Sequence, residues 1–450
     1  MKDLNNKIKV DDEFILDIKR IGINGEGIGF YNKMAVFVDG ALPGEGHNVK
    51  VTKVDNKMAF AKSLSIKHES EFRQIPLCPY YKDCGGCTLM HVDYNQTLKY
   101  KKDLVIEALN RYTKLNVKQF EIKDTVSSEH PYNYRNKEQV YLKKTINGIK
   151  PCMIRPNSNI TFPIENCLIQ QNLINELNQS ILKLIDEFKI DLYDNKTKKG
   201  LIKQLVIRQN KKNEALVCFI VKENNKVFKE LASKIIKIDG VKSVYVNINS
   251  NDKSLEPFGE ETIHLTGDKF IVEELGKIKY QIYPTTFFQL NSCQAEKLYD
   301  LALKSAKLSF KERVLDAYCG VGTIGLYLAH NSKEVVGVEY NKEAVFAANE
   351  NAKLNKVKNA KFLQGDATEL LPKLMAESEF DVLVVDPPRV GLQEKFMKAI
   401  LESGIKKIIY ISCNPATLAK NLNVLSEKYK VNSITPVDMF SYTAHVETVC

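Results

Sequence analysis

A cysteine stands between a predicted strand and a predicted helix near the end of the chain. Residues 407–412 are mostly apolar and β-branched, which predicts a short buried strand, and Cys413 follows it directly. Asn414 is suited to cap a helix, and Pro415 is suited to its first position. The positive end of a helix favours thiolate over thiol, which makes Cys413 a candidate nucleophile. The alternative is a small apolar residue that closes the strand.

A glycine-rich segment follows an earlier apolar strand and opens another helix. The strand is predicted at 314–318, and three glycines between residues 320 and 325 let a ligand approach the backbone closely. Glu339 ends the next strand, where it can accept hydrogen bonds from the ribose hydroxyls of an adenosine-type cofactor. Asp366 follows the third strand and suits the adenine edge. Since the pattern is not G-x-G-x-x-G, it favours S-adenosylmethionine over NAD.

The fourth strand of this series ends in Asp386-Pro387-Pro388-Arg389. The prolines stiffen the turn, and the carboxylate of Asp386 can bind a planar heterocycle. The alternative is an ordinary turn between a strand and a helix. Because Cys413 ends the next strand, the pairing of the two residues favours a site.

Three cysteines occur within ten residues: Cys78, Cys84 and Cys87, with two glycines between the last two. Thiolates are the soft ligands that iron–sulfur clusters and zinc select, and the glycines let the backbone fold closely around a metal centre. The spacing predicts an iron–sulfur cluster, with zinc as the alternative and coincidental clustering as a third interpretation. The nearest candidates for a fourth ligand are Cys152 and Cys167.

The elements fall into three consecutive regions. Short strands at 14–18, 36–39, 49–54 and 58–64 predict a small barrel, and the glycines of 22–29 predict tight bends within it. From residue 310 onward, strands alternate with helices, which predicts a parallel sheet covered on both faces. Residues 431–439 and 445–450 are candidates for a closing hairpin. The predicted limits are 1–67 for the barrel, 68–282 for a central α+β domain and 283–450 for the parallel sheet, with helix 93–115 a candidate to pack on that last domain.

Charge and cysteine content narrow the class of protein. The 450 residues carry a formal net charge of +10, which is compatible with a polyanionic partner such as RNA. Ten cysteines indicate a reducing compartment, and we expect a cytoplasmic protein. The sequence shows neither a predicted membrane span nor a signal peptide, and nothing in it indicates an obligate protein partner, so a monomer is expected.

Together these motifs resemble those of the RNA 5-methyluridine methyltransferases that carry an N-terminal TRAM domain and an iron–sulfur cluster. The likeness covers nearly the whole chain and is greatest to the bacterial 23S ribosomal RNA branch. It implies an OB-like TRAM barrel that binds RNA, a central α+β domain that holds the cluster, and a Rossmann-like α/β domain that binds S-adenosylmethionine. The segments that carry it further are FFQLN at 287–291, YNYRNK at 132–137, IENCLI at 164–169 and HVE at 445–447.

The resemblance also implies a role for individual residues. It assigns a [4Fe–4S] cluster to Cys78, Cys84, Cys87 and Cys167; the cofactor to Gln289, Tyr318, Thr323, Glu339, Asp366 and Asp386; the nucleophile to Cys413; the proton acceptor to Glu447; and the target nucleotide to Arg135 and Asp386. Ser441 departs from the family, where a proline is usual, and family members usually run several residues beyond the position of Cys450.

The implied activity is methylation of uridine C5 in 23S ribosomal RNA through addition of Cys413 to uracil C6. A transfer RNA substrate is the first alternative. Cytosine-5 RNA methyltransferases also use a cysteine, but those enzymes typically place one directly after Asp-Pro-Pro, where this chain has Arg389. A non-catalytic RNA-binding iron–sulfur protein is the remaining alternative, which the presence of both Cys413 and Glu447 disfavours.

Overall fold

The computed structural model describes residues 8–251 and 256–450. The chain folds into two compact units, each built from segments that are separated in sequence. Unit 1 contains the chain up to Glu129 together with Pro388–Gly391 and Ser412–Cys450, and unit 2 contains His130–Pro387 and Leu392–Ile411.

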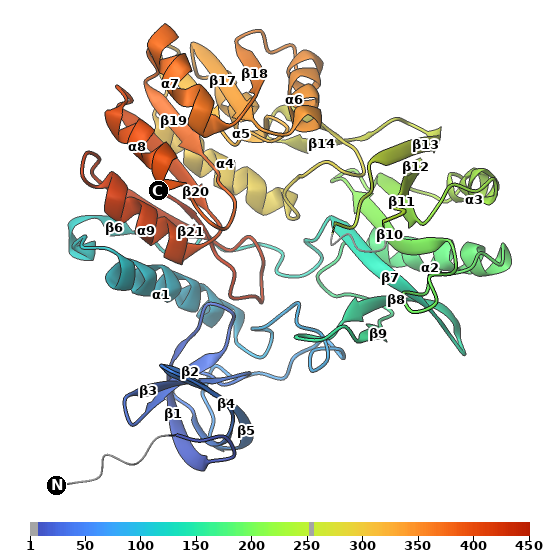
Figure 1. Ribbon diagram of the computed structural model, residues 1–450, viewed down its shortest axis with the longest axis horizontal. Coiled ribbons are helices and arrows are strands. Elements are labelled where there is room, and N and C mark those ends of the chain that lie inside the picture. The colour runs from blue at the N-terminus through green and yellow to red at the C-terminus, as the bar shows by residue number, and fades with distance from the viewer. Residues whose placement is uncertain (1–7, 252–255) are drawn as a thin grey trace. The chain divides into compact units, whose positions relative to one another are not determined.

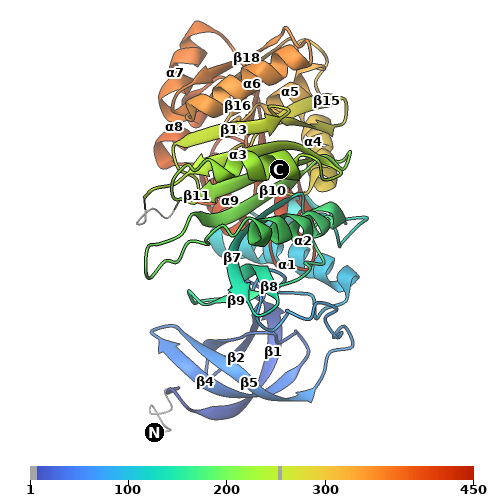
Figure 2. The same cartoon turned by 90° about the vertical axis from the view of Figure 1, so that its right-hand side faces the viewer.

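Unit 1 begins with a closed five-stranded barrel in the order β1-β2-β3-β5-β4, drawn in blue in Figures 1 and 2. Its strands are β1 (Glu13–Ile21), β2 (Gly27–Tyr31), β3 (Met34–Val38), β4 (Gly46–Asp55) and β5 (Met58–His68). Alternate residues point inward, and the core contains Leu16, Ile18, Val36, Val38 and Val49. The predicted OB-like barrel is therefore confirmed.

The glycine-rich segment of the barrel is partly strand, where the sequence predicted only bends. Gly27 and Gly29 lie in β2 because no larger residue fits there. A Cβ atom added to Gly27 would lie 2.5 Å from the carbonyl oxygen of Ala41, and one added to Gly29 would lie 2.5 Å from that of Asp17. These glycines permit close approach of neighbouring backbones.

The rest of unit 1 surrounds one long helix, α1 (Tyr94–Tyr112), which the side chain of Asp93 caps. This helix packs along α9 (Pro415–Leu425). The predicted closing hairpin is present as β21 (Ser433–Val437) and β22 (Glu447–Val449), which pair antiparallel. A short turn of 3₁₀ helix, η1 (Val117–Gln119), leads to β6 (Glu121–Ile122), which pairs with β21.

Unit 2 contains a seven-stranded sheet in the order β13-β12-β11-β10-β7-β8-β9. One face of it is covered by two helices, as Figures 1 and 2 show, and residues of both helices join the sheet in a single apolar core. The elements are β7 (Lys137–Thr145), β8 (Gly148–Ile154), β9 (Thr161–Pro163), α2 (Asn172–Glu187), β10 (Ile202–Gln209), β11 (Ala215–Val221), α3 (Val227–Ile235), β12 (Val241–Ile248) and β13 (Glu261–Gly267).

Unit 2 also contains the predicted parallel strands, in the order β18-β17-β16-β19-β20. These strands are β16 (Arg313–Ala317), β17 (Glu334–Glu339), β18 (Ala360–Gln364), β19 (Val382–Val385) and β20 (Lys407–Ser412), whose last residue belongs to unit 1. The helices are α4 (Ser292–Ala306), α5 (Thr323–Ala329), α6 (Lys342–Leu354), α7 (Ala367–Glu377) and α8 (Glu394–Glu402). Helices α4 to α6 pack with the hairpin β14 (Ile271–Leu275) and β15 (Ile278–Ile282), and α7 packs with α8. The predicted Rossmann-like α/β fold is confirmed.

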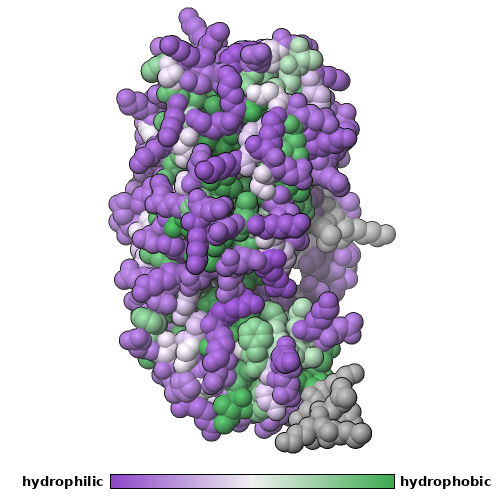
Figure 3. Space-filling model, turned by 90° about the vertical axis from the view of Figure 1, so that its left-hand side faces the viewer, coloured by the Kyte–Doolittle hydropathy of each residue, from purple (hydrophilic) through white to green (hydrophobic). Residues whose placement is uncertain are grey.

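On the face drawn in Figure 3, hydrophilic side chains cover most of the surface, and hydrophobic residues lie between them in small groups. Within the described part of the chain, none of the helices has both the length and the apolar character needed to cross a membrane.

Candidate active site

In unit 2, acidic residues gather at the carboxyl edge of the parallel sheet. Strand β16 lies between β17 and β19, and all three run in the same direction. Asp316 lies near the end of β16, Glu339 ends β17, and Asp386 follows β19 directly. This edge is where open α/β sheets bind their ligands.

The turn after β16 is shaped to receive a cofactor. The Glu339 carboxylate accepts hydrogen bonds from the backbone N–H groups of Gly320 (3.1 Å) and Asn341 (2.8 Å), which fix its position at the edge. Tyr318 and Gly320 have positive φ angles of 66° and 54°. No heavy atom lies within 4 Å of a Cβ atom added to Gly320, so the space beside this turn is open. The geometry leaves room for an adenosine-type cofactor beside this turn.

Two of the acidic residues have strongly raised pKa values. Asp316 is fully buried, and burial raises its pKa to about 8, although the N–H of Gly325 donates a hydrogen bond of 2.8 Å to its Oδ2 atom. Its Oδ1 atom is buried and has no hydrogen-bond partner in the structure. Burial also raises the pKa of Asp386 to about 7. At neutral pH these carboxyl groups can therefore hold a proton, and the motif alone did not indicate this for either residue.

Tyr318, Thr323 and Asp366 lie in the turns and helix starts that follow strands of this sheet, whereas Gln289 lies in the segment before α4. The ring of Tyr318 packs edge-on against Phe396, with 5.7 Å between ring centroids. Thr323 begins α5, and the exposed Asp366 caps α7 by accepting a hydrogen bond from the N–H of Thr368 (2.7 Å). Gln289 is half-buried, and its carbonyl accepts a hydrogen bond from the Asn136 amide (3.0 Å).

In unit 1, the segment around Cys413 is held on both sides by hydrogen bonds. Asn414 caps α9, as predicted, by accepting a hydrogen bond from the N–H of Ala416 at 3.0 Å. The Asn414 amide also donates to the carbonyl of Arg389 (3.2 Å), and the N–H of Asn414 donates to the Ser412 hydroxyl (3.2 Å). Cys413 stays partly exposed between these fixed neighbours. Such a position suits a nucleophile at a helix N-terminus.

Glu447 lies beside the segment that carries Cys413. It begins β22 and is largely buried, with 7% of its surface exposed. The hydroxyl of its neighbour Thr448 donates a hydrogen bond of 3.1 Å to the carbonyl oxygen of Ser412, which precedes Cys413. The nucleophile and the proton acceptor expected from the resemblance are therefore held on two directly bonded segments.

A buried ion pair, which the sequence analysis did not predict, acts electrostatically on Glu447. Lys101, in α1, and Asp438 are both fully buried and form an ion pair. Tyr94 and Ser441 donate hydrogen bonds to the other oxygen of Asp438, at 2.5 and 2.7 Å. Burial lowers the pKa of Lys101, while the charges of Asp438 and Glu447 act in the opposite direction. Ser441, which departs from the family pattern, thus has a structural role in this network.

A histidine–arginine contact lies next to Glu447 in sequence. His445 is exposed, and its Nδ1 atom lies 3.5 Å from a guanidinium nitrogen of Arg389. Partial desolvation of the ring, together with the charges of Arg389 and Lys101, lowers the pKa of His445. We therefore expect His445 to be neutral near pH 7.

The cysteine-rich loop of unit 1 provides thiols of the right kind for a metal centre. Cys78, Cys84 and Cys87 are each partly exposed. Burial raises the pKa of Cys84, while a hydrogen bond from the Gly86 N–H acts against this rise. Among residues 8–251 and 256–450, however, no group of three or more His, Cys, Asp or Glu side chains is arranged to hold a metal ion. The donor types fit an iron–sulfur cluster, but the side chains are not gathered around one.

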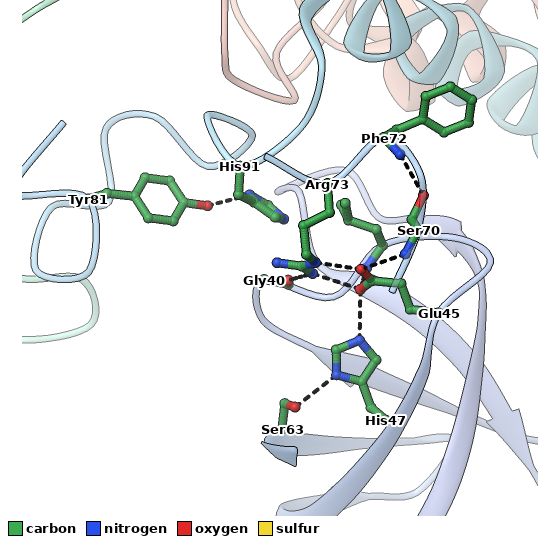
Figure 4. A network of polar contacts seen from close by, with 10 residues as sticks. Gly40, Glu45, His47, Ser63, Ser70, Phe72, Arg73, Tyr81 and His91 are labelled. Atoms are coloured by element: carbon green, nitrogen blue, oxygen red, sulfur yellow. Dashed lines mark hydrogen bonds and ion pairs between the residues drawn. The ribbon is translucent and has the colours of Figure 1, made fainter. Parts of the chain in front are cut away.

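Figure 4 shows the network that joins the barrel to the segment 69–93, which contains these cysteines. The buried carboxylate of Glu45 binds the guanidinium of Arg73 through both oxygens, at 2.5 and 2.7 Å. The ring of His47 contacts the same carboxylate at 2.8 Å, and the N–H groups of Leu42 and Ser70 donate to it. Burial alone would raise the pKa of Glu45, but these hydrogen bonds hold it well below its ordinary value.

Cys167, the predicted fourth ligand of the cluster, and Arg135, a predicted substrate contact, both lie in unit 2. Cys167 precedes α2, where the side chain of Asn175 bonds to both its N–H (3.0 Å) and its carbonyl (3.2 Å). Arg135 precedes β7, and its Nε atom donates to the carbonyl of Lys137 at 3.0 Å. Each is therefore fixed by its own neighbours.

Unit 1 also contains a groove that suits RNA. Its volume is about 510 Å³, and it is lined by residues of the barrel, of α1 and of the first turn of α9, among them Arg20, Phe37, Arg111, Tyr112 and Pro415. Aromatic rings next to guanidinium groups are typical of surfaces on which nucleobases stack. Pro415 is two positions after Cys413, so the groove reaches the helix that follows the candidate nucleophile.

A parallel sheet with a glycine turn and acidic strand ends defines an α/β protein that binds a nucleotide-type cofactor at the carboxyl edge. Comparison with known proteins is more specific. Residues 93–450 match the family model described as tRNA (Uracil-5-)-methyltransferase, and residues 10–64 match the TRAM domain. The chain therefore belongs to the tRNA (uracil-5-)-methyltransferase family of RNA methyltransferases and carries a TRAM domain.

Relatives and solved structures agree with this assignment. The chain is 40% identical over 449 residues to an uncharacterised RNA methyltransferase of Halalkalibacterium halodurans, covering 99% of this chain and 97% of that one. It is 40% identical over 447 residues to one of Clostridium acetobutylicum, covering 98% and 97%. The crystal structure of Pyrococcus abyssi tRNA (uracil-54, C5)-methyltransferase in complex with S-adenosyl-L-homocysteine is similar with a TM-score of 0.77 and 29% identity, covering 97% of this chain and 99% of that one.

Proposed function

We propose that this protein transfers a methyl group from S-adenosylmethionine to C5 of a uridine in 23S ribosomal RNA, giving 5-methyluridine. The observation that carries the proposal is the hydrogen bond between Thr448 and Ser412, which joins the segments of Glu447 and Cys413. A nucleophile beside a buried carboxylate is the pair of groups that substitution at C5 requires.

The chemistry begins with the ring, because C5 of uracil is a weak nucleophile. Addition of the Cys413 thiolate to C6 gives an enolate whose C5 is nucleophilic. S-adenosylmethionine supplies the methyl group that C5 takes up, and its sulfonium leaves as a neutral thioether. Glu447 then accepts the proton from C5, the C5–C6 double bond re-forms, and the Cys413 thiolate is released.

Asp386 and Glu339 are proposed to position the reactants. A carboxyl group with a pKa of about 7 can donate or accept a hydrogen bond, so Asp386 is suited to a uracil edge and to the enolate oxygen that forms. Glu339 is suited to the ribose of the cofactor, with Gln289, Tyr318, Thr323 and Asp366 as further proposed contacts. Arg135 is proposed to reach the target nucleotide.

The choice of RNA needs its own experiment. The 23S proposal rests on the resemblance, whereas the similar solved structure is of a transfer RNA enzyme, which favours transfer RNA as the second candidate. Mapping 5-methyluridine in ribosomal and transfer RNA from cells that lack the gene decides between them. A site lost only from transfer RNA would contradict the 23S assignment.

The roles of Cys413 and Glu447 predict different defects. Cys413→Ala removes the nucleophile, so RNA and cofactor should still bind, without methyl transfer or covalent adduct. Glu447→Gln removes the base but leaves attack and methyl transfer intact. The methylated adduct should then persist as a protein–RNA species that survives denaturing electrophoresis and carries radiolabel from the cofactor methyl group.

Controls make this test specific. Cys293→Ala, at an exposed cysteine of α4, should keep the wild-type rate. RNA with 5-fluorouridine should trap the wild type, because fluorine cannot leave as a proton does. Wild-type turnover by Glu447→Gln would assign the base to another group, and a labelled adduct with Cys413→Ala would refute the mechanism.

We also propose that Cys78, Cys84, Cys87 and Cys167 hold a [4Fe–4S] cluster with a structural role. The close spacing of three thiols in one loop and the N–H of Gly86 directed at Cys84 support it. Anaerobically purified protein should then contain iron and acid-labile sulfide, and Cys87→Ala should lose both while Cys152→Ala keeps them. Stoichiometric zinc without iron would refute the cluster. The proposed location is the cytoplasm, where thiols stay reduced.

A further inference from the structure

Two basic side chains lie directly opposite each other on neighbouring strands of unit 2. Lys137 begins β7, and Arg208 lies in β10 at the position that pairs with it. Residues opposite each other in a ladder point to the same face, so both side chains share one face of the seven-stranded sheet. Their neighbour Ile207 points to the other face, into the core with α2 and α3. The two cations therefore lie on the face opposite these helices.

Neither cation has a carboxylate partner in the part of the chain that the structure describes. Arg208 is only 5% exposed, it donates one hydrogen bond to the carbonyl of Thr286, and its buried Nε atom has no partner. Lys137 lies over the ring of Phe258, 5.5 Å from the ring centroid. Burial and the charges of Arg208 and Arg135 lower the pKa of Lys137 to about 7.

Two neighbouring groups that could supply negative charge do not do so. Glu138 follows Lys137 and therefore points to the other face, where it is buried and accepts hydrogen bonds from Gln170 and Asn178. Cys218 lies next to Arg208 and Lys137, but burial strongly raises the pKa of its thiol, which is neutral at physiological pH. Among the described residues, the site therefore keeps a positive charge without an internal counter-ion.

A buried cation without a counter-ion destabilises the folded protein, so such an arrangement calls for an anionic ligand. The surroundings indicate which kind. Arg135 bonds to the backbone of Lys137, and Phe287, which follows Thr286, leaves 75% of its surface exposed. A phosphate flanked by a base fits basic groups beside an exposed aromatic ring, because the ring offers the base a surface for stacking.

We propose that Lys137 and Arg208 form a binding site for one phosphate group of the RNA backbone, on the face of the sheet opposite α2 and α3. This rests on the proposed function, because it takes the RNA that is methylated as the ligand. The site adds a fixed contact in unit 2 to those that the barrel is expected to make.

The test uses the full-length protein and an unmodified RNA oligonucleotide that contains the target uridine found by the mapping experiment. Lys137→Met and Arg208→Met remove one charge each with little change in side-chain length. Each should weaken RNA binding about tenfold at 150 mM salt, as expected for one charge-assisted contact. The slope of log K against log salt should become shallower by roughly 0.7. Lys150→Met is the matched control, since this lysine of β8 is paired with Glu165 at 3.0 Å, and it should change neither quantity.

Two further measurements separate this site from other roles. The melting temperature of the RNA-free Lys137→Met protein should stay equal to or exceed that of the wild type, because an uncompensated charge is removed; a drop would show a structural role and overturn the proposal. Affinity for S-adenosylmethionine should not change. A loss of cofactor affinity with an unchanged salt slope would assign the site to the carboxylate of the cofactor.

The phosphate that binds at this site can also be located along the RNA. Replacing single phosphates of the oligonucleotide by neutral methylphosphonates should weaken wild-type binding at one position that has no effect in Lys137→Met. If every position weakened both proteins equally, the phosphate site would be refuted. Crosslinking of wild-type enzyme to 5-fluorouridine RNA is scored separately, so failure of the methylation proposal would be seen independently.

Discussion

Asp316 is a buried carboxyl group beside the cofactor turn, and its charge state links stability to pH. Its pKa of about 8 lies far above the ordinary value of 3.8. The folded protein therefore holds this proton more tightly than the unfolded chain does. The contribution of Asp316 to stability is complete below about pH 4 and is lost as pH rises through about 8.

We predict that Asp316→Asn makes stability less dependent on pH. Asparagine keeps an acceptor for the Gly325 N–H but cannot ionise, so a loss of at most about 1.4 kcal/mol per pH unit between roughly pH 4 and 8 should disappear. Urea denaturation at several pH values measures this. Asp381→Asn serves as the control, because the pKa of Asp381 is lowered, first by a hydrogen bond from the Arg313 backbone. Equal slopes for wild type and Asp316→Asn would contradict the prediction.

Lys101 is predicted to stabilise unit 1 and to supply a positive charge near Glu447 that assists proton removal. Lys101→Met leaves Asp438 buried without its cation, which should cost about 3–5 kcal/mol in the free energy of unfolding. Removal of the C5 proton should also slow, so the methylated adduct should accumulate in single-turnover reactions. Thermal melts and gels of the trapped adduct measure the two effects.

A double-mutant cycle gives the control for Lys101. Combining Lys101→Met with Asp438→Asn should cost less than the sum of the single changes, because the two residues share one interaction. Additive losses would show that the pair is not coupled.

At the residue level, the sequence contains signals for some of these groups and none for others. Cys413, Glu339 and Asp386 end predicted strands, so their place at the sheet edge follows from the pattern. Lys101 stands in the apolar stripe of its helix, between Tyr100 and Leu104, and such a position is a signal for a buried ion pair. Its partner is 337 residues away in the chain, so the pair itself could not be predicted.

At the level of elements, the five parallel strands were predictable because short, largely apolar segments alternate with helical segments. Strands β8, β9 and β13 and the hairpin β14–β15 were missed, since their residues are partly exposed and mix charged with apolar types. Strand β2 was hidden by its glycines, which the sequence associates with bends. Cys78, Cys84 and Cys87 were found by their spacing and Cys167 through the resemblance, but spacing alone does not determine how the thiols are arranged.

We predict that Arg73→Leu loosens the loop that joins the barrel to α1. Glu45 would stay buried with only His47 and backbone N–H groups as partners, which should cost about 3 kcal/mol in the free energy of unfolding. Proteolysis should then cut the loop near the three cysteines first. Arg313→Leu is a matched control in unit 2, where Arg313 pairs with the partly exposed Glu334. Unchanged melting of Arg73→Leu would refute the role of the network.

For the whole molecule, the basic net charge predicts that RNA binding depends strongly on salt. If about five phosphates are neutralised, log K should fall against log salt with a slope of roughly −3.5. Fluorescence anisotropy of a labelled oligonucleotide between 50 and 400 mM salt measures the slope. A slope near zero would mean that the lysines and arginines only solvate the surface.

The division of the chain shows where consecutive sequence and compact structure differ. Three consecutive domains were expected, and their limits stay a prediction. The barrel shares an apolar cluster with α1 and with the loop before β22, in which Ile21 and Leu42 pack with Leu104 and Ala444. Local patterns do not reveal such a cluster, because its members are spread over more than four hundred positions.

That shared cluster has a consequence for synthesis on the ribosome. Ile21 and Leu42 leave the exit tunnel early, but Ala444 follows only after all of unit 2 has been made. At roughly 5–20 residues per second, the residues that the barrel and α1 contribute to this cluster wait some tens of seconds for Ala444. The cluster is therefore completed only at the end of synthesis, and the segments of Cys413 and Glu447 are the final part of the protein to be assembled.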